Sequence, residues 1–187
     1  ARAGVAEAIR RGLHVDSGLH DYLTDDPELV ALAAEAGVVL RDIRKPKTTR
    51  ELHFFCGKIA EVDSVIVAVL GTDSAVGKRT TALILERGLE AAGLKALVIG
   101  TGQTAWLQGV RHGILLDSIV NDFVAGEIEH VIHTAWREER PDVMLLEGQG
   151  SLLNPAYPGG FELLAAGRPQ AVVLQHAPAR RDHDGFP

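Results

Sequence analysis

Sulfur is nearly absent from this chain of 187 residues, which has one cysteine, Cys56, and one methionine. A single thiol excludes a disulfide framework and any zinc or iron–sulfur site built from cysteines, and it favours a reducing, cytoplasmic environment. Long apolar runs are missing as well. The longest aliphatic stretch, residues 65–70, is far shorter than the roughly 20 residues that a membrane-spanning helix requires. We therefore expect a protein without a membrane partner.

Positive charge is also in short supply. The formal net charge is −6 and the isoelectric point is about 5.7, which argues against a nucleic-acid backbone as the main partner. Hydrophobic residues make up 46% of the chain and charged residues 24%, close to the averages for soluble globular proteins. Disorder, collagen and coiled coil are therefore poor descriptions, and any bound phosphate should be held by local features of the fold.

Segments of helical and strand periodicity alternate along the chain. This alternation predicts an α/β fold with a mainly parallel sheet. Asp26 before Pro27 is typical of a helix N-terminus, and Gly37 is typical of a helix end. Helices are expected over residues 1–11, 26–37, 77–92 and 121–139. Strands are expected over residues 13–15, 38–43, 65–70, 95–99, 113–116, 143–146 and 171–174, with a loop around Trp106.

A basic segment divides the chain. Residues 41–50 hold five basic side chains and one acidic one, which is typical of a solvated linker, with a dedicated anion site as the alternative. We assign residues 1–50 to the remainder of a Rossmann-like nucleotide-fold domain with its linker, and residues 51–187 to a P-loop α/β domain. Because the chain begins without methionine and stops in a loop, we expect a longer protein, with this second domain continuing past Pro187.

The clearest motif is the glycine-rich segment between an apolar strand and an amphipathic helix, Gly71-Thr-Asp-Ser-Ala-Val-Gly-Lys-Arg-Thr-Thr81. Backbone N–H groups and a helix N-terminus bind phosphate in this context, and Lys78 adds a positive charge. Two positions depart from the usual pattern: Thr72 replaces a glycine, and Arg79 replaces the hydroxyl that normally binds magnesium. Arg79 can itself contact phosphate through two hydrogen bonds, whereas Thr80 supplies the hydroxyl only if the loop is rewound. We assign cofactor binding to Asp73, Ser74, Gly77, Lys78, Arg79, Thr80 and Thr81.

Polar side chains follow two further strands, at the edge of a parallel sheet where ligands bind. Glu147 comes directly after residues 143–146 and before a glycine-rich turn. An acid there can act as a base, hold a metal or cap the turn. His176 follows the last strand, where a histidine either takes part in catalysis or makes a structural hydrogen bond. We name Glu147 and His176 as catalytic candidates.

Substrate binding is assigned to four residues. The charged cluster at 180–184 suits a substrate with two carboxylates, although solvated surface is the alternative. No metal site is expected, because His130 and His133 lack the partners of a zinc motif. The residues assigned to substrate are Gln149, Tyr157, Arg180 and Arg181.

Several ordered motifs make the chain similar to known families. They lie at residues 71–73 with 77–82, 104–109, 121–123, 147–150, 157–163 and 175–178. The loop 71–78 alone resembles that of dethiobiotin synthetase. From about Gly18 to the end, the sequence resembles the P-loop family once catalogued as a domain of unknown function and now associated with D-glutamate N-acetyltransferase. Ser74 stands where that family has cysteine, and Ala105 where it has glycine.

The resemblance implies transfer of an acetyl group from acetyl-CoA to the amino group of D-glutamate or a similar acidic D-amino acid. Residues 73–81 would then bind cofactor phosphate without hydrolysing it, which accounts for the displaced magnesium hydroxyl. The alternative is a ligase or kinase that uses ATP and magnesium, with Thr80 and Glu147 holding the metal; a nucleotide-sensing module without chemistry is a third possibility. The expected partner is a small acidic amino acid, and the expected assembly is a homo-oligomer that binds no nucleic acid.

Overall fold

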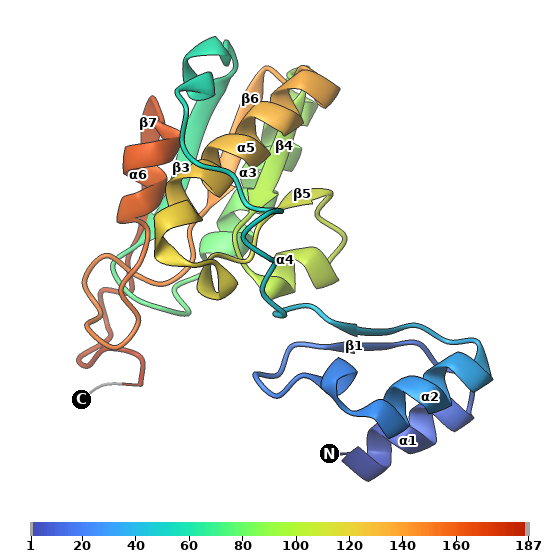
Figure 1. The fold of residues 1–187 in the computed structure, drawn as a ribbon. Coiled ribbons are helices and arrows are strands. Elements are labelled where there is room, and N and C mark those ends of the chain that lie inside the picture. Colours follow the sequence, from blue (N-terminus) through green and yellow to red (C-terminus); the bar gives the residue numbers. More distant parts are fainter. Residues whose placement is uncertain (1, 186–187) are drawn as a thin grey trace. The chain divides into compact units, whose positions relative to one another are not determined.

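The computed structural model describes residues 2–185; Ala1, Phe186 and Pro187 lie outside that range. The chain forms two compact units that divide between Lys47 and Thr48 (Figure 1). Each unit combines helices with a sheet of parallel strands, so the predicted α/β fold class is confirmed. Within residues 2–185, no helix combines the length and the apolar character that crossing a bilayer requires.

The first unit is a small βαβ element preceded by one helix. Its elements are α1 (Arg2–Arg10), β1 (Val15–Ser17), η1 (Leu23–Asp25), α2 (Pro27–Ala36) and β2 (Leu40–Asp42). The two strands pair in parallel, and α2 connects them. Asp26 caps α2 by accepting hydrogen bonds from the backbone N–H groups of Glu28 and Leu29, and Gly37 ends it with a φ of 65°. Both predicted ends of this helix are thus confirmed.

The second unit contains a five-stranded parallel sheet. Its elements are η2 (Lys58–Glu61), β3 (Val65–Gly71), α3 (Lys78–Ala91), β4 (Ala96–Gly100), α4 (Gln103–Leu107), β5 (His112–Gly113), η3 (Leu116–Ser118), α5 (Asn121–Glu139), β6 (Val143–Glu147), α6 (Phe161–Gly167) and β7 (Ala171–Gln175). The strand order is β5-β4-β6-β3-β7. β3 therefore lies between β6 and β7 (Figure 1), and the carboxyl ends of all three strands meet at one edge of the sheet.

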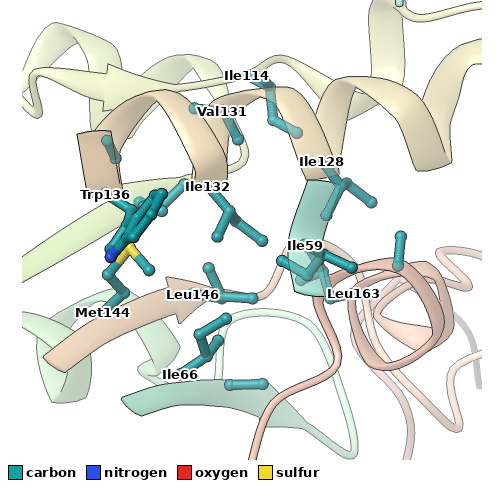
Figure 2. Close-up of a cluster of buried hydrophobic side chains, with 14 of the residues drawn as sticks. Ile59, Ile66, Ile114, Ile128, Val131, Ile132, Trp136, Met144, Leu146 and Leu163 are labelled. Carbon is teal, nitrogen blue, oxygen red and sulfur yellow. The ribbon is translucent and has the colours of Figure 1, made fainter. Parts of the chain in front are cut away.

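Apolar side chains cover both faces of this sheet. On one face, α5, α6 and η2 pack against the strands through residues such as Ile132, Leu163 and Ile59 (Figure 2). On the other face, α3 packs through Ala82 and its partly buried leucines. The central strand β6 is buried along its whole length and β3 along most of it, so both read in the sequence as continuous apolar runs rather than alternating ones.

Some short elements differ from the sequence-based predictions. The segment around Trp106 contains the helix α4 rather than only a loop, and the helix α6 was not predicted. Helices of five and seven residues are too short to give a clear helical period. β5 is also shorter and earlier than the predicted strand 113–116, and β1 begins two residues later than expected. The long helix α5 has the predicted bounds.

Candidate functional site

The strand β3 leads directly into the phosphate loop, which we define as residues 71–81. Gly77 has a φ of 96° and α3 begins immediately after it, at Lys78. Only glycine adopts this left-handed conformation without strain. Lys78 Nζ donates a hydrogen bond to the carbonyl oxygen of Asp73 at 3.1 Å, so the loop curls around the lysine ammonium. The predicted strand, loop and helix are all present.

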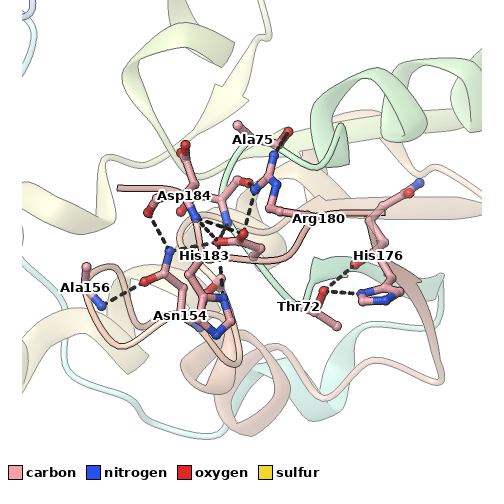
Figure 3. Close-up of polar contacts among 12 residues, drawn as sticks. Thr72, Ala75, Asn154, Ala156, His176, Arg180, His183 and Asp184 are labelled. Carbon is pink, nitrogen blue, oxygen red and sulfur yellow. Dashed lines mark hydrogen bonds and ion pairs between the residues drawn. The ribbon is translucent and has the colours of Figure 1, made fainter. Parts of the chain in front are cut away.

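The carboxylate of Asp73 anchors this loop to a later part of the chain. It is 4% exposed and accepts hydrogen bonds from Ser74 N at 2.7 Å, Asn154 Nδ2 at 2.8 Å, Asp184 N at 3.0 Å and Arg180 Nη1 at 2.6 Å (Figure 3). Burial opposes ionisation, but these donors, led by Arg180, hold the pKa of Asp73 well below its usual range. The predicted contact between Asp73 and a cofactor stays a prediction, because its carboxylate already has four donors.

Arg180 lines a small cavity beside His176 and also crosses the phosphate loop. Besides Asp73, its guanidinium donates to the carbonyl oxygens of Ser74 at 2.8 Å and Ala75 at 3.5 Å (Figure 3). Ala75 has a φ of 50°, a strained value for a residue with a side chain. The contacts of Arg180 therefore hold an otherwise unfavourable loop conformation. The assignment of this arginine to substrate stays a prediction, because the hydrogen bonds of its guanidinium are to the loop.

Replacing Asp73 by asparagine is expected to lower stability at neutral pH and to flatten the acid side of the stability curve. A depressed carboxylate pKa contributes stability that is present above the unfolded-state pKa, near 4, and is lost as pH falls through the folded-state value. Urea unfolding at several pH values from about 3 to 7 measures both effects. The exposed Asp182, replaced by asparagine, is the control. Equal pH dependence in the parent and Asp73→Asn would contradict this role.

Glu147 lies on the β6 side of the phosphate loop, beside two cations. It is 5% exposed, and its Oε1 is 3.0 Å from Arg79 Nε. Burial raises the pKa of Glu147, while the positive charges of Arg79 and Lys78 oppose that rise. After Glu147 the chain runs tightly against β3, since a Cβ on Gly148 would lie 2.9 Å from the carbonyl oxygen of Val69. The site thus joins a buried acid to the basic residues of the loop.

His176 lies on the opposite side of β3, because β6 and β7 are its two different neighbours. His176 Nδ1 is 2.9 Å from Thr72 Oγ1 (Figure 3). The histidine also lines a small cavity of about 110 Å³, together with Arg181 and His183. His176 and Glu147 are both catalytic candidates from the sequence, but the phosphate loop separates them and they contact different partners.

The other predicted residues have varied surroundings. Ser74 is tied to Asp73 and Arg180 through its backbone, as described above. Thr80 is exposed, whereas Thr81 accepts a hydrogen bond from Gln175 Nε2. The ring of Tyr157 is exposed but lies against Gly185. Gln149 follows β6, and its side-chain oxygen is buried.

Asn154 and Gln103 are not among the site residues assigned from the sequence. Asn154 is 1% exposed and links Asp73 to the backbone carbonyl of Asp184. Its only signal in the sequence is the following Pro155, which indicates a turn. Gln103 begins α4, and its side-chain oxygen is buried. In the described part of the chain, no three histidine, cysteine or acidic side chains are grouped so that they could hold a metal ion.

Comparison with known proteins gives consistent matches along the whole chain. Two curated relatives, from Tritonibacter scottomollicae and a Pseudoalteromonas species, are each 35% identical to it and each bear the name D-glutamate N-acetyltransferase. The matches span 184 and 189 residues, and each covers 98% of this chain and 53% or 54% of the relative. The chain therefore spans about half the length of these relatives.

The fold and both units match one family. A crystal structure of a DUF1611 family protein from Anabaena variabilis superimposes with a TM-score of 0.88 at 30% identity, covering all of this chain and 52% of that one. Residues 1–46 match the Rossmann-like domain DUF1611_N, and residues 53–187 match the P-loop domain DUF1611_C, both described as domains of unknown function. The resemblance seen in the sequence is confirmed, and this chain belongs to the DUF1611 family.

Proposed function

We propose that this chain carries the cofactor-binding and amine-activating residues of an N-acetyltransferase. The reaction moves an acetyl group from acetyl-CoA to the amino group of D-glutamate or a similar acidic D-amino acid. The observation that carries the proposal is the pairing of Arg79 with Glu147 at the position where an ATP-hydrolysing loop needs a hydroxyl and magnesium. The names of the two curated relatives agree with this reaction.

The residues present suit the phosphates of acetyl-CoA better than magnesium-bound ATP. Lys78 and Arg79 supply two positive charges beside the backbone N–H groups at the start of α3, which is a favourable setting for phosphate oxygens. A magnesium ion beside Glu147 would meet the guanidinium of Arg79, 3.0 Å from the carboxylate. Two positive charges bound to one buried carboxylate repel each other strongly, so the residues do not fit a magnesium ion.

Glu147 is the proposed proton acceptor. The ammonium group of the substrate must lose a proton before its nitrogen attacks the thioester carbonyl. Glu147 takes that proton, and the new C–N bond forms as the C–S bond breaks. The CoA sulfur leaves as a thiolate, which takes up the second proton that the attacking nitrogen loses. Because burial raises the pKa of Glu147, its carboxylate is a stronger base than a solvated glutamate.

The small cavity beside His176 suits the side-chain carboxylate of an acidic substrate, the one farther from its amino group. It is lined by Arg180, Arg181 and His183 as well as by His176. Arginine is well suited to a carboxylate because its planar guanidinium donates two parallel hydrogen bonds. We therefore keep Arg181 as a substrate-binding residue, whereas Arg180 holds the phosphate loop in shape.

Metal removal and Arg79→Ala together test this function. We expect the complete product of the gene that encodes this chain to release CoA from acetyl-CoA when D-glutamate is present, with no loss of rate in a chelator. Arg79→Ala should weaken acetyl-CoA binding by about tenfold or more, the scale of a lost charge-assisted hydrogen bond. Thiol release and calorimetric titration measure the two effects.

Arg87→Ala is the matched control, because Arg87 is an exposed arginine on the same helix. Its acetyl-CoA affinity should equal that of the parent. A requirement for millimolar magnesium, or turnover of ATP in place of acetyl-CoA, would instead support the ligase or kinase alternative and reject the acetyltransferase.

A further inference from the structure

Three buried side-chain oxygens near the phosphate loop lack a hydrogen-bond partner in residues 2–185. They are Glu147 Oε2, Gln103 Oε1 and Gln149 Oε1, and the neighbouring Arg79 Nε is a buried donor that also lacks a hydrogen-bond partner. A buried acceptor that stays unpaired is costly, and most such groups in folded proteins have a partner. Three together at one edge of a sheet are therefore expected to serve a ligand with several hydrogen-bond donors.

The three residues belong to two neighbouring loops. Gln103 follows β4, and Glu147 and Gln149 follow β6; these strands pair in the sheet (Figure 1). Thr101 Oγ1 joins the loops by donating to the carbonyl oxygen of Glu147 at 2.6 Å. The side chain of Gln149 lies over Gly102, where an added Cβ would be 3.3 Å from Gln149 Oε1. Gln149 Oε1 and the start of α4 are thus on the β4 side of Glu147, whereas His176 follows β7 on the other side of β3.

We propose that these three oxygens form a subsite for a primary ammonium group. An ammonium group has three N–H donors and one positive charge, matching three acceptors of which one is a carboxylate oxygen. A carboxylate or phosphate would bring only further acceptors and leave the three oxygens unpaired. The identification of this group as the amine of D-glutamate rests on the proposed function, whereas the chemistry of the subsite does not.

The positive charges beside the subsite determine the order in which the cofactor and the ammonium group bind. Arg79 contacts the other oxygen of Glu147, and Lys78 is close enough to act on its charge. Without a phosphate, these two cations disfavour a third one. When CoA binds, its phosphates offset the charges of Lys78 and Arg79. We therefore expect the ammonium group to bind more tightly after the cofactor.

The test compares D-glutamate with glutarate, which has the same two carboxylates but no ammonium group. Each is titrated into the complete gene product saturated with CoA, which has the phosphates but no acetyl group to transfer. Gln103→Met and Gln149→Met keep the side-chain length and remove the acceptor. Each variant should bind D-glutamate about tenfold more weakly, as expected for one hydrogen bond to a charged group, while glutarate affinity stays at the parent value.

The matched control is Gln108→Met, an exposed glutamine just after α4, which should change neither affinity. Equal losses of affinity for D-glutamate and glutarate in Gln103→Met and Gln149→Met would overturn the subsite. The glutamines would then shape the site without contacting the ammonium group. Unchanged D-glutamate affinity in both variants would also overturn it. So would D-glutamate binding that is no tighter with CoA than without it.

The outcomes separate this subsite from the proposed function. If D-glutamate binds in the expected manner but acetyl-CoA transfers nothing to it, the acetyltransferase is rejected and the ammonium subsite stands. If acetyl transfer occurs but D-glutamate affinity is unchanged in both methionine variants, the ammonium subsite is rejected and the acetyltransferase stands. If the parent protein binds no D-glutamate at all, both are rejected.

Discussion

Replacing Glu147 by glutamine is expected to lower kcat by about 10²–10⁴-fold, the usual contribution of a general base. The amide keeps the shape of the side chain but cannot take the proton of the substrate ammonium. Because the loss falls on the chemical step, acetyl-CoA affinity should stay close to the parent value. Steady-state rates at saturating acetyl-CoA and D-glutamate, with calorimetric titration of acetyl-CoA, measure the two quantities.

The pH dependence of the rate of the parent protein is a second test of the role of Glu147. Glu147 acts as a base only when it is ionised, and burial raises its pKa. The rate should therefore fall as pH drops through a value above the ordinary glutamate range, and Glu147→Gln should lack this acid limb. His176→Ala is the control. A Glu147→Gln protein with normal kcat beside an inactive His176→Ala protein would move the role to the histidine.

Replacing Lys78 by alanine is expected to weaken acetyl-CoA binding by about 2–3 kcal/mol, or roughly 30- to 150-fold. The lysine ammonium is half-buried, and burial lowers its pKa, so a bound phosphate would pair a cation that is only partly solvated. Within the loop, Lys78 donates a single hydrogen bond, to the Asp73 carbonyl. The free energy of unfolding should therefore change by no more than about 1 kcal/mol.

Calorimetry and urea unfolding separate these effects. Lys58→Ala removes an exposed lysine from η2 and should leave both measurements unchanged. Parent-like affinity for acetyl-CoA in Lys78→Ala would show that the loop does not bind the cofactor phosphates. A large loss of stability with that variant would mean that the lysine mainly supports the fold.

The local structure of this chain is largely readable from its sequence. The Asp26 cap and Gly37 end of α2, and the strand, loop and helix around Lys78, all depend on residues close together in the chain. The two shortest helices, α4 and α6, carry too few residues for a periodic signal. Their positions follow from packing against the sheet, which depends on the whole fold.

The pairing of site residues is much harder to predict. Glu147 contacts Arg79 because β6 lies beside β3, and His176 is on the other side because β7 is the opposite neighbour. That strand order has no local signal in the sequence. Asp73 and Arg180 are 107 residues apart, and each carries a charge that suits a ligand as well as a partner within the protein. The sequence therefore identified functional residue types without showing which of them bind one another.

The hydrogen bonds of Asp73 determine the step at which the phosphate loop loses its conformational entropy. Asn154, Arg180 and Asp184 hold the loop through Asp73 before any ligand is present, so its conformational freedom is given up when the chain folds. A phosphate group then meets a preorganised loop, and little of its binding energy is consumed in ordering it. Cofactor affinity consequently depends on residues far along the chain that need never touch the cofactor.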